Sequence, residues 1–295
     1  MRDGILLLDK PLGLSSSAAT QRVRRLLGGV KAGHVGSLDP LATGMLPICL
    51  GEATKLAGAI LEGDKLYRFT VALGSRTATG DVEGAIVEEQ PVPPADPRAL
   101  QQVIESFVGE SWQVPPMYSA IKQGGQPLYK LARAGKTVER APRPIRITRL
   151  LAERVGDTLV CEVECGKGTY VRVLAEDIAR ALGTVGHVTH LRRERVQPFP
   201  QAGMLTLTQI EEACARGDWP PLLGPAEVLP QLRQVSLDSH ARRHLLHGQS
   251  IQVPGADYGS GELLVLLGPA GEFLGLGQGL GGAGIAPKRL VAAAP

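Results

Sequence analysis

The amino-acid sequence predicts an α+β fold in which a large mixed unit is followed by a small, mostly β unit. Strand-like and helix-like segments mix without strict βαβ alternation, which disfavours a doubly wound parallel sheet. The composition shifts near residues 225–234, and residues 235–295 then combine short apolar runs with many glycines. The chain has 295 residues, 43% of them hydrophobic, so it is long enough to bury two hydrophobic cores.

A short strand and a helix open the chain. Residues 4–9 form an apolar run that predicts a buried strand. Serines then precede a segment in which Val23, Leu26 and Leu27 share one face, as expected for a helix with a serine N-cap. A glycine-rich loop follows and leads into an apolar stretch at 41–51.

The middle of the chain contains both periodicities. Tyr67 and Phe69 begin an alternating apolar face that is typical of a strand, whereas Arg172 lies just off the apolar stripe of a later helical segment. The period predicts strands at 66–73, 145–151 and 158–165, and helices at 98–107 and 171–182.

The charge is distributed unevenly along the chain. Residues 120–195 contain 15 Lys/Arg and 8 Asp/Glu, a balance of +7, whereas residues 61–119 contain 4 and 9, a balance of −5. A basic segment in a chain whose net charge is only +3 suits contact with a polyanion, and a solvated charged surface is the plain alternative.

The sequence gives no sign of a membrane segment. It has no run of eighteen or more apolar residues, and the apolar run in MRDGILLLDKP is too short for the core of a signal peptide. We therefore expect a cytoplasmic protein. In that reducing compartment the four cysteines, which form no CxxC pair, are expected to be small buried side chains that bind no metal.

Two patterns near the C-terminus resemble ligand-binding motifs but lack the required context. Residues 277–282 fit the dinucleotide pattern GxGxxG, yet only thirteen residues follow and none of them is acidic, so we interpret the segment as a β-turn. His240, His244 and His247 are spaced to share a helix face, but no HExxH motif or nearby ligand completes a zinc site. A solvent-facing basic helix is the interpretation we adopt.

The segment GHVGSLDPLATGMLP, residues 33–47, is the most informative part of the chain. Asp39 stands before Pro40, and an aspartate N-cap followed by proline at the first helical position explains that pair structurally. A lone carboxylate on a glycine-rich loop is equally compatible with a nucleophile next to a ligand. By physical reasoning alone, both interpretations of Asp39 stay open.

The wider pattern resembles a known family. Residues 33–55 resemble the catalytic motif of the TruB family, the bacterial tRNA pseudouridine-55 synthases, and further blocks follow in the family's order over essentially the whole chain. These blocks are DKPLGLSS at 9–16, KLYRFTVALGSRTATGDVEG at 65–84, QVPPMYSAIKQGGQPLYKLARAG at 113–135, GTYVRVLAEDIARALG at 168–183, HVTHLRR at 187–193 and, most loosely, AGIAPKRLV at 283–291.

The resemblance implies a domain organisation. Residues 1–230 would form a pseudouridine-synthase catalytic domain, with a mixed, largely antiparallel sheet flanked by helices. Within it, residues of about 120–149 would be an RNA-contacting insertion. Residues 231–295 would form a small PUA-like RNA-binding domain.

The resemblance also implies an activity. A uridine in the T-arm loop of tRNA would be flipped out, cut from its ribose at N1, turned, and rejoined through C5. Nothing is oxidised or hydrolysed overall, so no cofactor or metal is expected. The expected partner is tRNA, which the protein would also help to fold, and no obligatory protein partner is evident.

The same resemblance assigns the site residues. Asp39 would be the essential carboxylate, kept ionised with a low pKa by Arg172. Tyr67 would stack on the flipped uracil or act as a general base. His34 would fill the space left by the flipped base. Contacts to the substrate or its loop would come from Tyr170, Leu191, Lys10 and Asp81, and contacts to RNA phosphates from Lys122, Lys130, Arg133 and Lys136.

Two other functions compete with this one. The chain could bind or fold RNA without catalysis, which the intact set of Asp39, Tyr67 and Arg172 argues against. It could instead be an enzyme of small nucleotides or glycosides that uses the same carboxylate, in which case it would turn over free uridine nucleotides.

Overall fold

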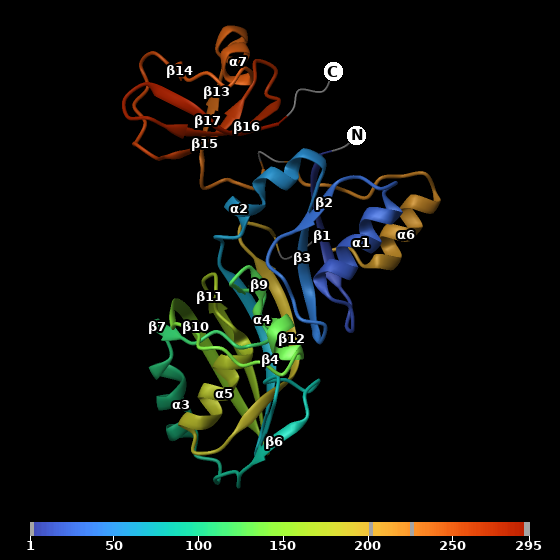
Figure 1. Ribbon diagram of the computed structural model, residues 1–295, viewed down its shortest axis with the longest axis vertical. Helices are drawn as coiled ribbons and strands as arrows, with labels where there is room; N and C mark the ends of the chain where they lie inside the picture. The colour runs from blue at the N-terminus through green and yellow to red at the C-terminus, as the bar shows by residue number, and fades with distance from the viewer. Residues whose placement is uncertain (1–2, 201–202, 225–226, 292–295) are drawn as a thin grey trace.

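The structure is a computed structural model that describes residues 3–200, 203–224 and 227–291 (Figure 1). It contains a large unit built on an eight-stranded sheet and a smaller C-terminal unit built on a five-stranded sheet. The α+β prediction is confirmed. Strand-rich and helical segments alternate irregularly along the chain, so the sheet is not a product of βαβ repeats.

The large sheet is mixed and mainly antiparallel. Among the described strands it has one parallel pairing, between β3 and β12, and this pairing joins the N-terminal strands to the middle of the sheet. Its order is β1 (Gly4–Lys10), β3 (Ala42–Leu50), β12 (Gly186–Val196), β4 (Lys65–Leu73), β11 (Thr158–Cys165), β10 (Arg143–Val155) and β7 (Gly109–Gln113), and β2 (Ala32–His34) pairs with β3 beside this path.

Helices lie against the sheet at both ends (Figure 1). Near β1 lie α1 (Ser16–Leu26) and α6 (Leu207–Ala215). α5 (Val171–Ala181) packs against the central strands β12 and β4, and α3 (Pro97–Ser106) packs against β10 toward the other end. The predicted serine N-cap is confirmed, because the side chain of Ser15 accepts a hydrogen bond from the backbone N–H of Ala18.

The alternation on β4 explains how α5 is fixed. Phe69 and Val71 on the inner face of the strand are buried in one cluster with Leu174 and Ile178 of α5. Each such side chain contributes about 1.5–3 kcal/mol when it leaves water. The N-terminus of α5, where Arg172 lies, is thereby held in a fixed place over the sheet.

The C-terminal unit is mostly β, as the sequence predicts. Its sheet has the order β13 (Arg233–Ser236), β15 (Leu263–Leu267), β16 (Phe273–Gly279), β17 (Gly284–Leu290) and β14 (Ile251–Gln252), with the short helix α7 (Ser239–Leu246) beside it. The GxGxxG pattern at 277–282 covers the end of β16 and the turn into β17, which confirms the β-turn interpretation. On α7, His240 is exposed and His244 is half-buried, and their rings are tilted by 54° with centroids 4.5 Å apart.

The two units share a hydrophobic cluster. Val265 and Leu276 of the small sheet are buried together with Leu56 and Ile60 of the large unit. The last two residues belong to the 3-10 helix η1 (Gly51–Leu56) and to α2 (Ala57–Ile60), which follow β3 directly. The C-terminal unit therefore rests on the segment that continues from the Asp39 loop.

The region of the expected insertion, about 120–149, ends inside a strand of the large sheet, as the alternation at 145–151 predicts. Short strands β8 (Lys122–Gln123) and β9 (Gln126–Pro127) lead into α4 (Leu128–Arg133), but residues 143–149 belong to β10 of the large sheet. Ile145 and Ile147 are buried there, because their alternation suits a strand that has only one face in contact with the core.

Three further findings concern membrane-spanning helices, metal-binding groups and the cysteines. No helix within residues 3–200, 203–224 and 227–291 is long and apolar enough to cross a membrane. The same residues contain no group of three or more His, Cys, Asp or Glu side chains that could hold a metal ion. The four cysteines are free thiols.

Close approach of β3 and β12 depends on Gly44. Its φ is +97°, and a Cβ at this position would lie 2.2 Å from the carbonyl oxygen of Arg193. We expect Gly44→Ala to lower the free energy of unfolding by well over the roughly 1–2 kcal/mol that a left-handed backbone alone costs an alanine. Urea denaturation measures the difference.

Gly13→Ala is the matched control, since Gly13 has a φ of +81° and no atom within 4 Å of the place that a Cβ would occupy. Its loss of stability should stay near the backbone cost alone. Equal losses in the two variants would show that the approach of the strands does not depend on Gly44.

Candidate active site

Asp39 lies on a turn between two strands rather than at the start of a helix. β2 ends at His34 and β3 begins at Ala42, and the backbone N–H of Ala42 donates to the carbonyl of Asp39 at 3.0 Å. Pro40 therefore occupies the second position of a β-turn, where its fixed φ is suitable. The N-cap interpretation of Asp39 is wrong, which leaves its side chain available for another role.

The turn is anchored to α1 on one side. The hydroxyl of Ser16 accepts a hydrogen bond from the backbone N–H of Leu38 at 2.7 Å and donates to the carbonyl of the same residue at 2.9 Å. Because Leu38 is also buried, the residue next to Asp39 is held by both packing and hydrogen bonds. This leaves little freedom for the carboxylate itself.

Asp39 forms an ion pair with Arg172. Arg172 Nε lies 2.9 Å from Asp39 Oδ2, and the arginine side chain is 5% exposed whereas that of the aspartate is 39% exposed. The other guanidinium nitrogens donate to the carbonyls of Thr79 and Tyr118, each at 2.7 Å. These buried hydrogen bonds fix the guanidinium of Arg172, which holds Asp39 at a solvent-accessible face of the protein.

Asp81 is the second carboxylate next to Arg172. Its Oδ2 lies 3.6 Å from Arg172 Nε, and its Oδ1 accepts hydrogen bonds from the Thr79 hydroxyl at 2.6 Å and the Glu83 backbone N–H at 3.1 Å. The Asp81 side chain is only 4% exposed. The structure therefore places it behind the arginine rather than on a surface that faces a substrate.

The pKa of Asp39 departs from the sequence-based expectation. Burial among protein atoms raises this pKa above its ordinary value, and the charge of Asp81 adds to the rise. Arg172 and Lys10 lower it, but desolvation is the largest effect. We predicted a pKa held low by Arg172, and the structure corrects this: Arg172 only limits a rise that burial causes.

Two tyrosines share this environment. Burial raises the pKa of both Tyr67, on β4, and Tyr170, directly before α5, and the negative charge of Asp39 contributes to both shifts. The structure therefore brings Tyr67, Tyr170 and Arg172 around Asp39, although the four residues come from three separate parts of the chain.

Gln113 is a site residue that sequence reasoning missed. Its side-chain oxygen accepts the backbone N–H of Tyr170 at 2.8 Å, and its side-chain nitrogen donates to the Tyr170 carbonyl at 3.2 Å. Tyr170 is the N-cap of α5 and has no side-chain cap, so this amide holds the start of the helix. The sequence signal for Gln113 was its position at the start of the family-like block 113–135.

Lys10 and His34 support the Asp39 loop. Lys10 is buried, and its ammonium group donates to the carbonyls of Pro11 and Leu14 at 2.8 and 2.6 Å. Burial lowers its pKa to about 8, although Asp39 acts in the opposite direction. His34 is half-buried and lies within 3.1 Å of the Thr20 and Ser37 hydroxyls, so it is fixed beside the turn.

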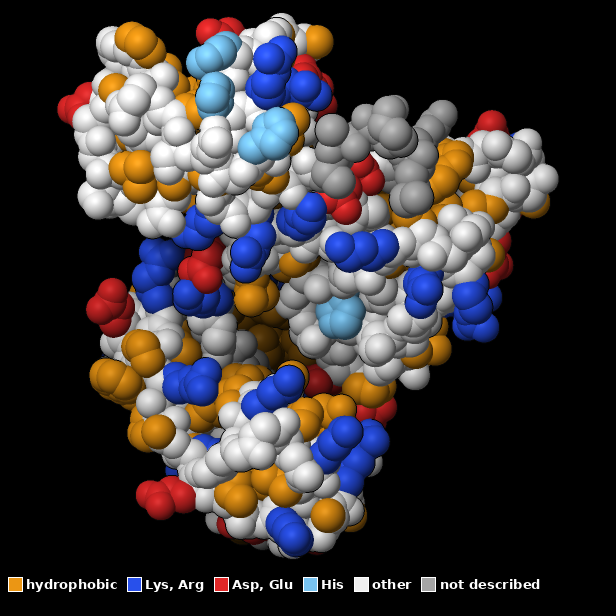
Figure 2. Space-filling model, turned by 45° about the horizontal axis from the view of Figure 1, so that its top comes forward, with side chains coloured by type: hydrophobic (Ala, Val, Ile, Leu, Met, Phe, Trp, Pro, Cys, Tyr) orange, Lys and Arg blue, Asp and Glu red, His pale blue; other side chains and the backbone are white. Residues whose placement is uncertain are grey.

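The remaining predicted residues are Leu191 and four basic side chains. Leu191 is buried in β12, directly opposite Phe69 of β4. The predicted phosphate contacts are all exposed, and they lie on or just beyond the segment from β8 to α4: Lys122, Lys130, Arg133 and Lys136. Lys and Arg side chains surround a hollow in the middle of the face shown in Figure 2, and hydrophobic side chains lie at its bottom.

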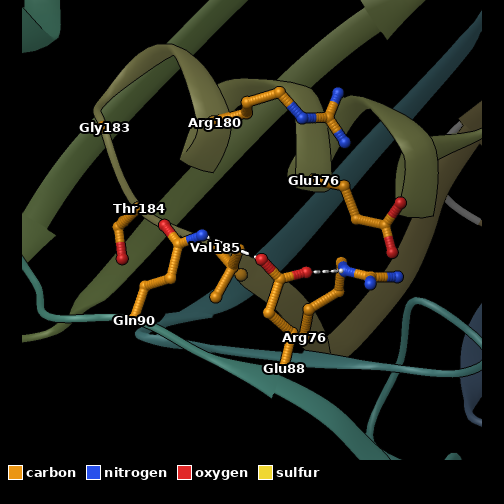
Figure 3. A pocket seen from close by; sticks show the side chains of 9 residues that line it. Arg76, Glu88, Gln90, Glu176, Arg180, Gly183, Thr184 and Val185 are labelled. Carbon is orange, nitrogen blue, oxygen red and sulfur yellow. Dashed lines mark hydrogen bonds and ion pairs between the residues drawn. The ribbon is translucent and has the colours of Figure 1, made fainter.

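A separate cavity of about 360 Å³ lies at the opposite end of α5. Figure 3 shows its two sides: Glu176 and Arg180 from the helix, and Arg76 and Glu88 from the hairpin of β5 (Ser75–Thr77) and β6 (Ile86–Glu89). Arg76 and Glu88 pair with each other at 2.8 Å. No predicted site residue lines this cavity.

The arrangement around Asp39 suits chemistry at a sugar carbon. An accessible carboxylate beside a fixed guanidinium can stabilise or attack an electron-poor carbon, and a nearby phenol can exchange a proton. None of these steps oxidises or reduces a side chain of the site.

Comparison with known proteins supports a single family. The family model described as TruB family pseudouridylate synthase (N terminal domain) matches residues 24–171. Two further models match the rest: tRNA pseudouridylate synthase B C-terminal domain at residues 172–229, and Pseudouridine synthase II TruB, C-terminal, at residues 234–291.

Individual proteins are similar over nearly the whole length. A tRNA pseudouridine synthase B from Aromatoleum aromaticum is 48% identical over 98% of this chain and 92% of its own, and one from Chromohalobacter salexigens is 47% identical over 98% and 94%. Among solved structures, a chain from a Cbf5-Nop10-Gar1 complex is 25% identical, with a TM-score of 0.74 over 95% of this chain and 79% of that one.

The electrostatics of the site make a prediction about Asp39. Removing the negative charge of Asp81 should lower the pKa of Asp39, so the Asp39 carboxyl carbon of Asp81→Asn should titrate at lower pH than in the wild type. Carbon NMR of protein labelled at aspartate carboxyls measures this titration.

Lys10→Met should move the same titration to higher pH, because the positive charge of Lys10 favours the ionised Asp39. Shifts in the same direction for both variants would contradict the charge arrangement described here.

Proposed function

The chain belongs to the TruB family of tRNA pseudouridine synthases, which are isomerases, and we propose that it converts the uridine at position 55 of the tRNA T-arm loop to pseudouridine with Asp39 as the essential carboxylate. The observation that carries this proposal is the ion pair of the accessible Asp39 with the buried Arg172. The pair supplies a fixed anion at a surface that a nucleoside can reach.

The reaction exchanges one bond to the ribose for another. The N1–C1′ bond breaks, the uracil ring turns, and C5 bonds to C1′; the proton on C5 is lost and N1 gains one. Bond breaking develops positive charge on the ribose and negative charge on the base. Asp39 stabilises the ribose or attacks C1′, as glycosidase carboxylates do. Attack on the uracil ring and a glycal route through C2′ use the same carboxylate.

The raised pKa of Asp39 gives Arg172 its role in this proposal. A neutral carboxyl group cannot act as a nucleophile, and burial alone favours the neutral form. Arg172 favours the ionised form from 2.9 Å. Asp81 shares that guanidinium from the buried side and fixes its orientation, and Gln113 holds the backbone of Tyr170 next to it.

The other side chains bind the flipped nucleotide. Tyr67 stacks on the uracil and exchanges a proton with it or with the sugar, Tyr170 hydrogen-bonds near the ribose, and Leu191 packs against the base. His34 fills the gap in the T-loop from the rim of the Asp39 turn. Lys10 keeps that turn in place through the carbonyls it binds.

The exposed basic segment positions the RNA. Lys122, Lys130, Arg133 and Lys136 contact T-arm phosphates, which gives affinity without reading the sequence. We further propose that residues 1–230 form the catalytic domain and residues 231–295 a PUA-like domain that binds the same tRNA. Recognition then depends on the bent shape of the loop.

The experiment that tests this function is Asp39→Asn. We expect pseudouridine formation in a T-arm stem-loop to fall by roughly 10⁴-fold or more, as for removal of other catalytic nucleophiles. Tritium release from C5-labelled uridine measures the rate. Binding of the RNA should be retained, because the phosphate contacts are unchanged.

Asp177→Asn on the exposed side of α5 is the control and should leave the rate unchanged. A normal rate in Asp39→Asn would refute the catalytic assignment. Turnover of free uridine nucleotides by the wild type would favour a small-molecule enzyme instead.

Salt dependence tests the phosphate contacts. Replacing Lys130 and Arg133 with glutamine should reduce the slope of log affinity against log salt by about 1.5, since each phosphate contact contributes about 0.7–0.9. Filter binding across a salt series measures the slope.

Arg22→Gln is the matched control, because Arg22 is an exposed arginine on α1 that already pairs with Glu211. An unchanged slope in the double variant would show that Lys130 and Arg133 only face solvent.

A further inference from the structure

Arg193 is a buried cation that the proposed mechanism does not use. It lies on β12 and is 1% exposed, so it is among the largest fully buried side chains of the described chain. No carboxylate within the described residues lies at ion-pair distance from it, in contrast to Arg172 and Arg192. Burying a charge without a counter-ion is strongly unfavourable, so its retention requires another explanation.

The guanidinium fastens the Asp39 turn to the sheet. Arg193 Nε donates to the carbonyl of Met45 at 2.7 Å, and Nη2 donates to the carbonyl of Gly36 at 2.8 Å. A Cβ on Gly36 would lie 3.2 Å from Arg193 Nη1, and the φ of Gly36 is +68°. The turn therefore approaches the guanidinium closely, and glycine at position 36 permits it.

Arg193 on β12 also lies next to Tyr67 on the neighbouring strand β4. The two residues are direct Cα partners in the antiparallel pairing of β12 with β4. Side chains at such positions point to the same face of the sheet and lie next to each other. The guanidinium lies close enough to the Tyr67 phenol to lower its pKa, against the effect of burial.

A hydrogen bond between these two groups can run in one direction only. A guanidinium has donors only, so the phenol oxygen would accept, and its own proton would point elsewhere. Asp39 lies close enough for its charge to act on the same phenol. The phenol is thus held between a fixed cation in the sheet and the carboxylate at the site.

We propose that Arg193 is a positioning residue that acts through Tyr67. It fixes the phenol oxygen as a hydrogen-bond acceptor, so that the hydroxyl proton is directed to the uridine held beside Asp39. This rests on the proposed function of Asp39 and Tyr67. Arg193 itself neither gains nor loses a proton in the reaction, and Tyr67 exchanges the proton with the substrate.

The charged and titratable groups around the pair come from several elements. Asp39 on the turn and Cys165 on β11 act on Tyr67. Around Arg193, the ionisable neighbours are Lys10 on β1, His34 on β2 and Lys65 on β4, and the positive charge of Arg193 lowers the pKa of each. Removal of Arg193 therefore has to be judged at Tyr67 directly.

A double-mutant cycle separates an effect through Tyr67 from a purely structural one. Arg193→Met keeps much of the volume and removes the charge, and we expect it to lower kcat on a T-arm stem-loop by roughly 10–100-fold, with less than about threefold change in RNA Kd. In a Tyr67→Phe background the same substitution should cause no further loss. Equal losses of kcat in both backgrounds would overturn the proposal, since they would show that Arg193 acts only through the loop that it binds at Gly36.

A second measurement does not depend on catalysis. Tyr67 replaced by 3-fluorotyrosine reports its own ionisation by fluorine NMR. We expect its pKa to rise in Arg193→Met and to stay near the wild-type value in Arg193→Lys, which keeps the charge. The same Tyr67 pKa in the wild type, Arg193→Met and Arg193→Lys would overturn the proposal. This outcome is independent of whether Asp39→Asn confirms or refutes the proposed function.

Arg192→Met is the matched control. Arg192 is the preceding arginine on β12, it pairs with Asp9 at 2.9 Å on the other face of the strand, and it lies outside the proposed site. Neither kcat nor the fluorotyrosine pKa should change in this variant. Changes as large as those in Arg193→Met would show a general response of the strand and would contradict the proposed role.

Discussion

The site depends on one buried guanidinium that is shared by two carboxylates. Arg172 lies 2.9 Å from Asp39 and 3.6 Å from Asp81, and its other nitrogens bind two backbone carbonyls. Burial of Asp39 and the nearby charge of Asp81 both favour a protonated Asp39. Arg172 is the positive charge in direct contact with Asp39 that opposes them. The sheet, α5 and the hydrogen bonds of Gln113 all serve to hold this arginine in place.

The same arginine links the site to the segment that we expect to contact RNA. Arg172 donates to the carbonyl of Tyr118, which lies shortly before β8 and α4. A change in the position of that segment would therefore reach the partner of Asp39 through a single hydrogen bond. In the proposed function, the hydrogen bond from Arg172 to Tyr118 couples RNA binding by this segment to the geometry of the Asp39 carboxylate.

A second buried cation lies next to Tyr67. Arg193 binds the carbonyl of Gly36 and is the cross-strand partner of Tyr67 on β4, so the carboxylate and the phenol each have an arginine from a different element beside them. The pKa of Asp39 and that of Tyr67 are both raised by burial, and each has a guanidinium that lowers it. Ionisable groups that are partly removed from water need such partners, because desolvation would otherwise favour their neutral forms.

The sequence by itself determined the α+β class, several of the strands and helices, and the segment that bears Asp39, because periodicity and a long specific motif are local properties. Only the tertiary structure showed that Asp39 is on a β-turn and that Asp81 lies behind Arg172. Gln113 and Arg193 were missed because their partners are distant in the chain. The net rise in the pKa of Asp39 was missed because desolvation depends on how many atoms surround a group, and no local pattern encodes that number.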